Sequence, residues 1–275
     1  MKKNLRKVLT VILVLVMAFS LGAVLWQQMN YRQGDTDYAD AESLAGVPQE
    51  TVAQPLPKPK AEKTETETPQ QEAVPEEVDP EAELLAALAA TDLGALREVN
   101  ADVLGWITIP GTKVNYPVLQ CADNDYYLDH TWKGERSSVG AIFVDYRNSA
   151  DFSDDNTLIY GHNMKNRSMF GELKYYINDG HWEAHPSIYL VDDGGVHRYD
   201  IYSIYEASVE AVTYDKTFAD QQAKTDFIHY GIRRSVVDTG IVPTAEDRII
   251  TLSTCTGVGY ETRWVVQAVL AETFT

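Results

Sequence analysis

Cysteine is scarce in this 275-residue chain, and positive charge is in short supply. The two cysteines, Cys121 and Cys255, are too few for a disulfide framework, and the lack of any CxxC pair argues against a structural zinc site. Lysine and arginine number 23 against 41 acidic residues, which gives a formal net charge of −18. Because this charge repels polyanions, we expect no nucleic-acid partner.

Charge is missing altogether from Val8 to Trp26, a run of nineteen residues that follows four basic residues between positions 2 and 7. A helix needs about 20 apolar residues to cross the hydrocarbon core of a membrane. The positive-inside rule then predicts a cytoplasmic tail at 1–7 and a transmembrane signal anchor in the plasma membrane at 8–26, with the rest of the chain outside.

The alternative for this segment is a signal peptide that is removed. Weak cleavage sites lie at Ala18-Phe19-Ser20 and Leu21-Gly22-Ala23. The apolar core of a signal peptide has roughly 7–15 residues, so the longer run favours an uncleaved anchor.

Large apolar residues are rare in the next segment, residues 27–83, whose main part (35–83) holds fourteen acidic residues and three lysines. Proline, glutamate, threonine and glutamine dominate it, and such a composition cannot bury enough surface to offset the entropy of ordering. We therefore expect an extended spacer that holds a domain at 84–275 away from the membrane. A short helix should open that domain, because leucines recur there at roughly helical spacing: Leu84, Leu85, Leu88, Leu93 and Leu96.

From Trp106 onward the chain consists of short β-branched and aromatic runs separated by turn formers such as Pro110-Gly111. Eight short strands with few helices predict a mainly β fold, a closed or nearly closed barrel. One helical pattern interrupts them at 217–234, with Phe218, Phe227, Ile228 and Ile232 on roughly one side. The strand candidates are WITI, VNYPVL, GAIFVDY, TLIYGH, SIYLVD, HRYDIYSIYEA, RIITLSTC and RWVVQAVLAE.

Cys255 ends the strand candidate RIITLSTC and is followed by Thr-Gly-Val-Gly, which is typical of a loop. A thiol at the mouth of a sheet is partly exposed, and in that setting a thiolate can act as a nucleophile. An isolated cysteine is more often a small buried core residue, so this signal is weak on its own.

His162 ends another strand candidate, TLIYGH, and histidine can carry protons near neutral pH. His181 and His185 have the i, i+4 spacing of a metal pair, but no third ligand is evident and we expect no metal site. The remaining histidines lie in polar contexts and should be solvated: His130, His197 and His229.

Arg263 begins the last strand candidate, and a lone arginine of this kind is usually a solvated charge. If residues 248–255 and 263–270 pair as antiparallel neighbours, however, its guanidinium and the Cys255 thiol face the same rim. A fixed cation there can stabilise the oxyanion that forms when a thiolate attacks a carbonyl. A cysteine, a histidine and an arginine at three strand ends would make an acyl-transfer site.

The sequence TLSTC, with Arg263 eight residues after its cysteine and YGHNM 93 residues before it, resembles the sortases. These are membrane-anchored cysteine transpeptidases of Gram-positive cell surfaces. The similarity to class B sortases continues through NADVLGWITIPGTKVNYPVLQ, DNDYYLDH, GAIFVDYRN and NTLIYGHNMKNRSMFGELKYY, and covers about residues 93–270.

The resemblance implies an eight-stranded sortase barrel with an N-terminal helix and a helix inserted before the penultimate strand. Cys255 would be the nucleophile, His162 the general acid and base, and Arg263 the group that holds the oxyanion. Thr256 departs from the acidic residue that class B enzymes often carry there, and Cys121 matches no known family position. The substrate groove would comprise Asn124, Leu128, Tyr160, Ser253 and Thr254.

The implied reaction needs no cofactor. The enzyme would cleave a sorting-signal peptide after threonine, through a thioacyl intermediate. An amine of a peptidoglycan precursor or cross-bridge, or a pilin lysine, would then take the acyl group.

Two other functions are compatible with the sequence. One is a hydrolase without transfer activity; a serine version is disfavoured because Ser253 lacks the G-x-S-x-G elbow. The other is a non-catalytic surface-binding barrel in which Cys255 and Cys121 form a disulfide, as an oxidising compartment allows.

Overall fold

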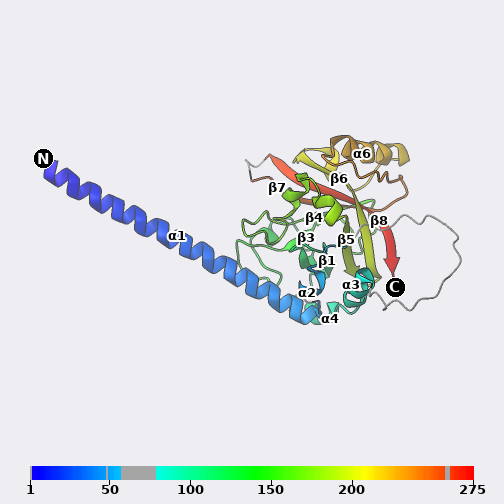
Figure 1. Cartoon of the computed structure of the whole chain (residues 1–275), viewed down its shortest axis with the longest axis horizontal. Helices are drawn as coiled ribbons and strands as arrows, with labels where there is room; N and C mark the ends of the chain where they lie inside the picture. The colour runs from blue at the N-terminus through cyan, green and yellow to red at the C-terminus, as the bar shows by residue number, and fades with distance from the viewer. Residues whose placement is uncertain (1, 48, 57–78, 258–260) are drawn as a thin grey trace, which may run out of the picture.

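The computed structural model describes residues 2–47, 49–56, 79–257 and 261–275. Within them, strands close a barrel in the order β1-β2-β3-β4-β7-β8-β6-β5 (Figure 1), which confirms the predicted eight-stranded architecture. The strands are β1 Val103–Thr108, β2 Asn115–Leu119, β3 Ile142–Val144, β4 Asn156–Tyr160, β5 Ser187–Asp192, β6 Gly195–Ser208, β7 Ile249–Cys255 and β8 Thr262–Phe274.

The barrel interior is filled by branched side chains such as Ile107, Leu252 and Val266, all fully buried. A small closed barrel is packed by its inward side chains, so the chemistry must lie at a rim. β4 and β7 run parallel and β7 and β8 antiparallel, so the carboxyl ends of β4 and β7 and the start of β8 meet at one rim.

Helices cover the outside of the barrel. They are α1 Lys2–Ala45, α2 Gln49–Val52, α3 Pro80–Ala89, α4 Leu93–Val99, α5 His181–Ala184 and α6 Gln221–Arg234, with 3₁₀ turns η1 Tyr126–Leu128, η2 Leu173–Ile177 and η3 Val212–Tyr214. The predicted helix before the penultimate strand is confirmed as α6. It begins at Gln221 rather than 217, because the Asp220 carboxylate accepts from the amide of Ala223 and caps it.

The leucine-rich pattern that predicted one short helix corresponds to two. Asp92 separates them: its carboxylate accepts from the amide of Ala95 and caps α4, just after α3 has ended. Leucines of both helices are buried in the same core cluster, Leu84 and Leu88 from α3 and Leu93 and Leu96 from α4.

The prediction of an extended spacer from residue 27 differs from the structure. α1 continues without a break to Ala45, and its last turns pack on the barrel (Figure 1). Tyr38, Ala41 and Ala45 are buried there because they recur at i, i+3 and i+7 on one face, a pattern that overall composition does not reveal. Val52 is buried too, and residues 57–78 of the predicted spacer lie outside the described residues.

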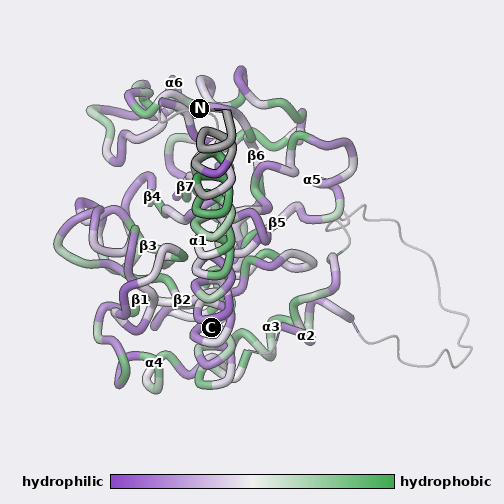
Figure 2. Tube along the Cα trace, turned by 90° about the vertical axis from the view of Figure 1, so that its left-hand side faces the viewer, coloured by the Kyte–Doolittle hydropathy of each residue, from purple (hydrophilic) through white to green (hydrophobic). Residues whose placement is uncertain are grey.

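The earlier part of α1 is apolar and exposed, and Figure 2 shows it as a green stretch of the helix. Phe19, for example, is 80% exposed, whereas a helix in a protein core would bury such a side chain. Among the described residues, α1 is the one helix that is long enough and apolar enough to cross a membrane. The candidate span runs from Ile12 to Ala45 and so contains residues 12–26 of the predicted span, 8–26.

Candidate active site

The register between β4 and β7 brings two distant segments to the same level of the rim. Tyr160 pairs with Ser253, and the Gly161 amide donates to the Ser253 carbonyl at 3.3 Å. Because parallel strands advance together, His162 and Cys255 each stand two residues beyond this pair. Cys255 in turn pairs directly with Arg263 across β7 and β8, as predicted from the sequence.

One cleft, with a volume of about 560 Å³ including its open mouth, contains all three residues. Every residue that the sequence predicted for the site lines this cleft. Phe143 and Gly161, which the sequence did not single out, complete its wall. The predicted set comprises Cys255, His162, Arg263, Asn124, Leu128, Tyr160, Ser253 and Thr254.

The His162 ring is held by the main chain of the opposite wall. Its Nε2 lies 2.7 Å from the Leu128 carbonyl oxygen. A carbonyl can only accept, so Nε2 must carry the hydrogen and Nδ1 is the nitrogen that can exchange a proton with a reacting group. Gly140 lies against the same ring at φ +63°, where an added Cβ would come within 2.9 Å of His162 Cδ2.

The cysteine strand is tied to the residue that follows the histidine. Asn163 Nδ2 donates to the Cys255 carbonyl at 2.8 Å, and Lys174 Nζ donates to the Asn163 side-chain oxygen at 3.4 Å. Neither Asn163 nor Gly140 was predicted from the sequence as a site residue. The only signal for Asn163 is its position directly after His162.

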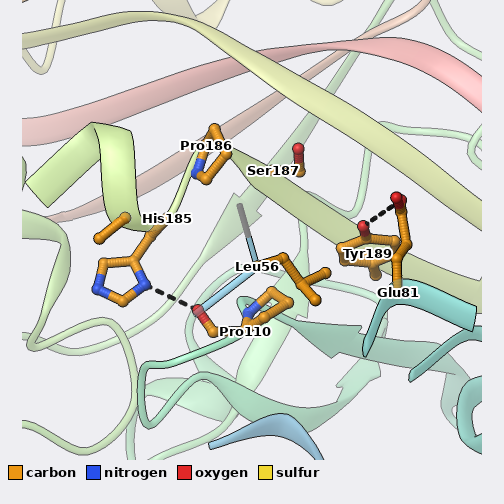
Figure 3. Close-up of a pocket in the computed structure, with 8 residues that line it drawn as sticks. Leu56, Glu81, Pro110, His185, Pro186, Ser187 and Tyr189 are labelled. Atoms are coloured by element: carbon orange, nitrogen blue, oxygen red, sulfur yellow. Dashed lines mark hydrogen bonds between the residues drawn. The ribbon is translucent and has the colours of Figure 1, made fainter. Parts of the chain in front are cut away.

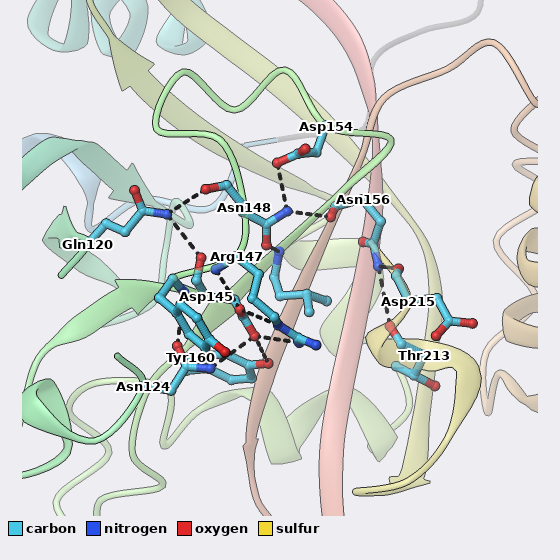
Figure 4. A network of polar contacts seen from close by, with 12 residues as sticks. Gln120, Asn124, Asp145, Arg147, Asn148, Asp154, Asn156, Tyr160, Thr213 and Asp215 are labelled. Atoms are coloured by element: carbon cyan, nitrogen blue, oxygen red, sulfur yellow. Dashed lines mark hydrogen bonds and ion pairs between the residues drawn. The ribbon is translucent and has the colours of Figure 1, made fainter. Parts of the chain in front are cut away.

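A buried carboxylate organises the groove side of the cleft (Figure 4). The Asp145 side chain is fully buried, and its Oδ2 accepts from Asn124 Nδ2 and from the Tyr160 hydroxyl, each at 3.0 Å. Two nitrogens of Arg147 donate to it at 2.8 Å. Burial raises the pKa of Asp145, but the hydrogen bonds from Arg147, Asn124 and Tyr160 outweigh it, so the pKa is lowered and the group is ionised.

The residues just before the cysteine are almost covered. Ser253 Oγ lies 3.1 Å from the Tyr214 hydroxyl. Thr254 is 2% exposed, and its buried hydroxyl has no hydrogen-bond partner among the described residues.

Two histidines outside the cleft, His185 and His197, have structural partners. The His185 ring donates through Nδ1 to the Pro110 carbonyl at 2.8 Å, in a small pocket where Glu81 also accepts from the Tyr189 hydroxyl (Figure 3). His197, expected to be solvated, is instead 7% exposed. Its two nitrogens contact Asp192 and Thr273, because the end of β8 covers a position that looked polar in the sequence.

Both cysteines are free thiols, so the structure contains no Cys121–Cys255 disulfide of the kind that a non-catalytic barrel could have used. Cys121 Sγ donates to the Asp123 carbonyl at 3.2 Å, and burial raises its pKa. Cys255 is half-buried and opens into the cleft.

Comparison with known proteins supplies an independent line of evidence. The sortase domain family model matches residues 107–271. Sortase B of Listeria monocytogenes is 39% identical over 181 residues, which are 65% of this chain and 74% of the relative. The structure of a Staphylococcus aureus sortase B–substrate complex superposes with a TM-score of 0.62 at 30% identity, covering 68% of this chain and 86% of that one.

The structure of Bacillus anthracis sortase B in complex with AAEK1 extends the match. It gives a TM-score of 0.67 at 28% identity and covers 89% of this chain and 99% of that one. With a cleft that unites a cysteine, a histidine and an arginine on this barrel, the chain belongs to the sortase family as a class B sortase, a cysteine transpeptidase.

Proposed function

We propose that this sortase cleaves a sorting-signal peptide after threonine and transfers the acyl group to a peptidoglycan amine. The observation that supports the proposal best is the meeting of Cys255, His162 and Arg263 in one open cleft. The structure of the S. aureus enzyme in complex with substrate supports a peptide as the ligand of this cleft.

In the proposed first half-reaction, the Cys255 thiolate attacks the threonine carbonyl. The Arg263 guanidinium stabilises the negative charge on the tetrahedral oxygen. His162 gives a proton through Nδ1 to the departing amine, the C–N bond breaks, and a thioester to Cys255 forms.

In the second half-reaction an amine attacks this thioester. His162, now neutral, takes the proton from the incoming nitrogen, and the thiolate of Cys255 leaves as the new amide forms. Because Nε2 is hydrogen-bonded to the Leu128 carbonyl, Nδ1 is the nitrogen that gives the proton in the first step and takes it in the second. A peptidoglycan cross-bridge or stem peptide would supply the amine, with a pilin lysine as the alternative acceptor.

The groove residues are assigned to the peptide. Asn124 and Tyr160 are held by Asp145, and Thr254 directly precedes the nucleophile and lines the same cleft. In the proposed topology residues 1–7 are cytoplasmic, residues 8–26 cross the plasma membrane, and the barrel is extracellular.

The test is a panel of quenched peptides carrying NPxTN-type and LPxTG-type motifs, incubated with the full chain in detergent and a cross-bridge amine. We expect an amine-capped acyl product by mass spectrometry, and none with Cys255→Ala. If the acyl product is only the free carboxylic acid, formed by hydrolysis, the result would favour the hydrolase. Activity in Cys255→Ala would refute the proposal.

A further inference from the structure

The last turns of α1 lie along one segment of the barrel, residues 132–140, which we call the buttress segment. Trp132 Nε1 donates to the Asp37 carbonyl at 2.6 Å, and Lys133 Nζ pairs with Asp40 at 2.6 Å. At Gly34 the helix approaches so closely that an added Cβ would lie 2.8 Å from a methyl group of Val139. The last turns of α1 therefore pack on the buttress segment through specific contacts, so the connection between α1 and the barrel is not a flexible linker.

Tyr38 is a buried contact between α1 and the barrel. Its side chain is 5% exposed, and its hydroxyl donates to the Gly140 carbonyl at 2.6 Å. Its ring meets the Tyr116 ring edge to face, with centroids 5.1 Å apart. The Tyr116 hydroxyl accepts from the Met169 amide at 3.1 Å. One side chain of α1 thus supports two separate loops of the barrel.

Both loops lie against His162 or its neighbour Asn163. Gly140 leaves no room for a side chain beside the ring: an added Cβ would lie 2.9 Å from His162 Cδ2 and 2.9 Å from the Leu128 carbonyl oxygen, which accepts from His162 Nε2. On the other side, Met169 pairs with Asn163, and the Phe170 amide donates to the His162 carbonyl at 3.0 Å. The orientation of the imidazole therefore depends on two loops that Tyr38 holds at fixed positions.

We propose that Tyr38 is a positioning residue for His162, through which the membrane-proximal helix holds the acid–base group of the cleft in its working orientation. The inference rests on the proposed role of His162. Proton transfer needs donor and acceptor within hydrogen-bond reach, so a loosened Gly140 loop slows the chemical step while the peptide groove stays intact. The anchor is then part of the catalytic unit.

The experiment compares Tyr38→Phe with wild type in the full chain. Phenylalanine keeps the ring contact with Tyr116 and removes the hydroxyl. We expect kcat to fall about tenfold, as the loss of one buried hydrogen bond near the reacting group allows, with KM unchanged. Tyr31→Phe is the matched control, because the Tyr31 hydroxyl accepts from Gln27 within the same helix.

Hydrogen exchange on the same variants supplies a second readout that needs no substrate. In Tyr38→Phe we expect faster exchange in the buttress segment, residues 132–140, and unchanged exchange in β5 and β6. A kcat equal to that of Tyr31→Phe, or exchange that rises equally over the whole barrel, would overturn the inference. Full transfer activity in Cys255→Ala would instead refute the proposed function, and the exchange result would still test the Tyr38 contact.

Discussion

At the scale of single residues, the cleft depends on groups that never touch the reacting atoms. The Asp145 carboxylate is the clearest case, since it is buried and fixes two groove residues, Asn124 and Tyr160. A buried charge is tolerated only when it is fully hydrogen-bonded, and Arg147 completes its partners. Removing the charge should therefore disturb both the stability of the barrel and the binding of the peptide.

We expect Asp145→Asn to lower the free energy of unfolding at pH 7 by about 2 kcal/mol and to raise KM for the peptide about fivefold. The folded pKa of Asp145 is lowered, so its stabilising contribution is complete above about pH 4, the pKa of an unfolded aspartate, and is lost as the pH falls through the folded pKa. The difference between wild type and variant should thus shrink in acid.

Urea unfolding between pH 3 and pH 7 measures this difference. Asp125→Asn is the control, because Asp125 is exposed on the neighbouring loop and makes no capping hydrogen bond with its side chain. A pH-independent gap between Asp145→Asn and wild type would contradict the prediction.

At the scale of elements, α6 packs on β6 and β8 through a glycine. An added Cβ at Gly231 would lie 2.3 Å from Gln267 Oε1. Gln267 is buried and bonded to the hydroxyls of Tyr202 and Thr251. α6 can therefore approach β8 this closely only because residue 231 has no side chain.

Gly231→Ala sets two effects against each other. Alanine improves helix propensity by about 1 kcal/mol, while overpacking a core costs about 1–3 kcal/mol and the displaced Gln267 hydrogen bonds about 1 kcal/mol more. We expect a net loss of about 2 kcal/mol, measured by urea unfolding. His229→Ala, on the exposed side of the same helix, should change stability by less than about 0.5 kcal/mol. An unfolding midpoint of Gly231→Ala at or above that of wild type would show that the helix can move to accommodate the methyl group.

At the scale of the whole molecule, α1 sets the distance between the barrel and the proposed membrane span. Among the described residues, Asn30 makes the first side-chain hydrogen bond from α1 to the buttress segment, with its Nδ2 donating to Ser138 Oγ at 3.4 Å. Trp26, the last residue of the uncharged run, lies four residues earlier, which is about 6 Å along a helix. The barrel should therefore sit directly at the headgroup layer.

Quenching by spin-labelled headgroups in nanodiscs tests this placement. A fluorophore at Ser138→Cys should be quenched strongly, and one at Asp193→Cys weakly, in a Cys121→Ser, Cys255→Ala background. Asp193 lies at the turn between β5 and β6. The start of β6 pairs with the C-terminal end of β8, where Val196 is opposite Phe274. Figure 1 places this end of β8 on the side of the barrel away from the start of α1. Equal quenching at both positions would mean that the barrel stands off the membrane.

Much of this was predictable from local patterns. The strands were found because β-branched and aromatic residues cluster between turn formers. The eight residues predicted for the site, which line one cleft, came from the resemblance of several short segments to a known family. Asp145, Gly140 and Asn163 were missed, since a carboxylate, a glycine and an amide next to strand ends have no distinctive local signature. The docking of α1 was missed for a related reason: its buried stripe is short and lies within an acidic segment.

The sequence by itself determined the kind of chemistry available and the presence of a barrel, because residue type and periodicity are local properties of the chain. Only the tertiary structure decided which nitrogen of His162 carries the hydrogen, which groups hold Asn124 and Tyr160, and that Tyr38 at the end of α1 donates to the Gly140 carbonyl beside His162. Each of these depends on contacts between residues that are remote in the chain, and the register of the closed barrel sets which remote residues meet.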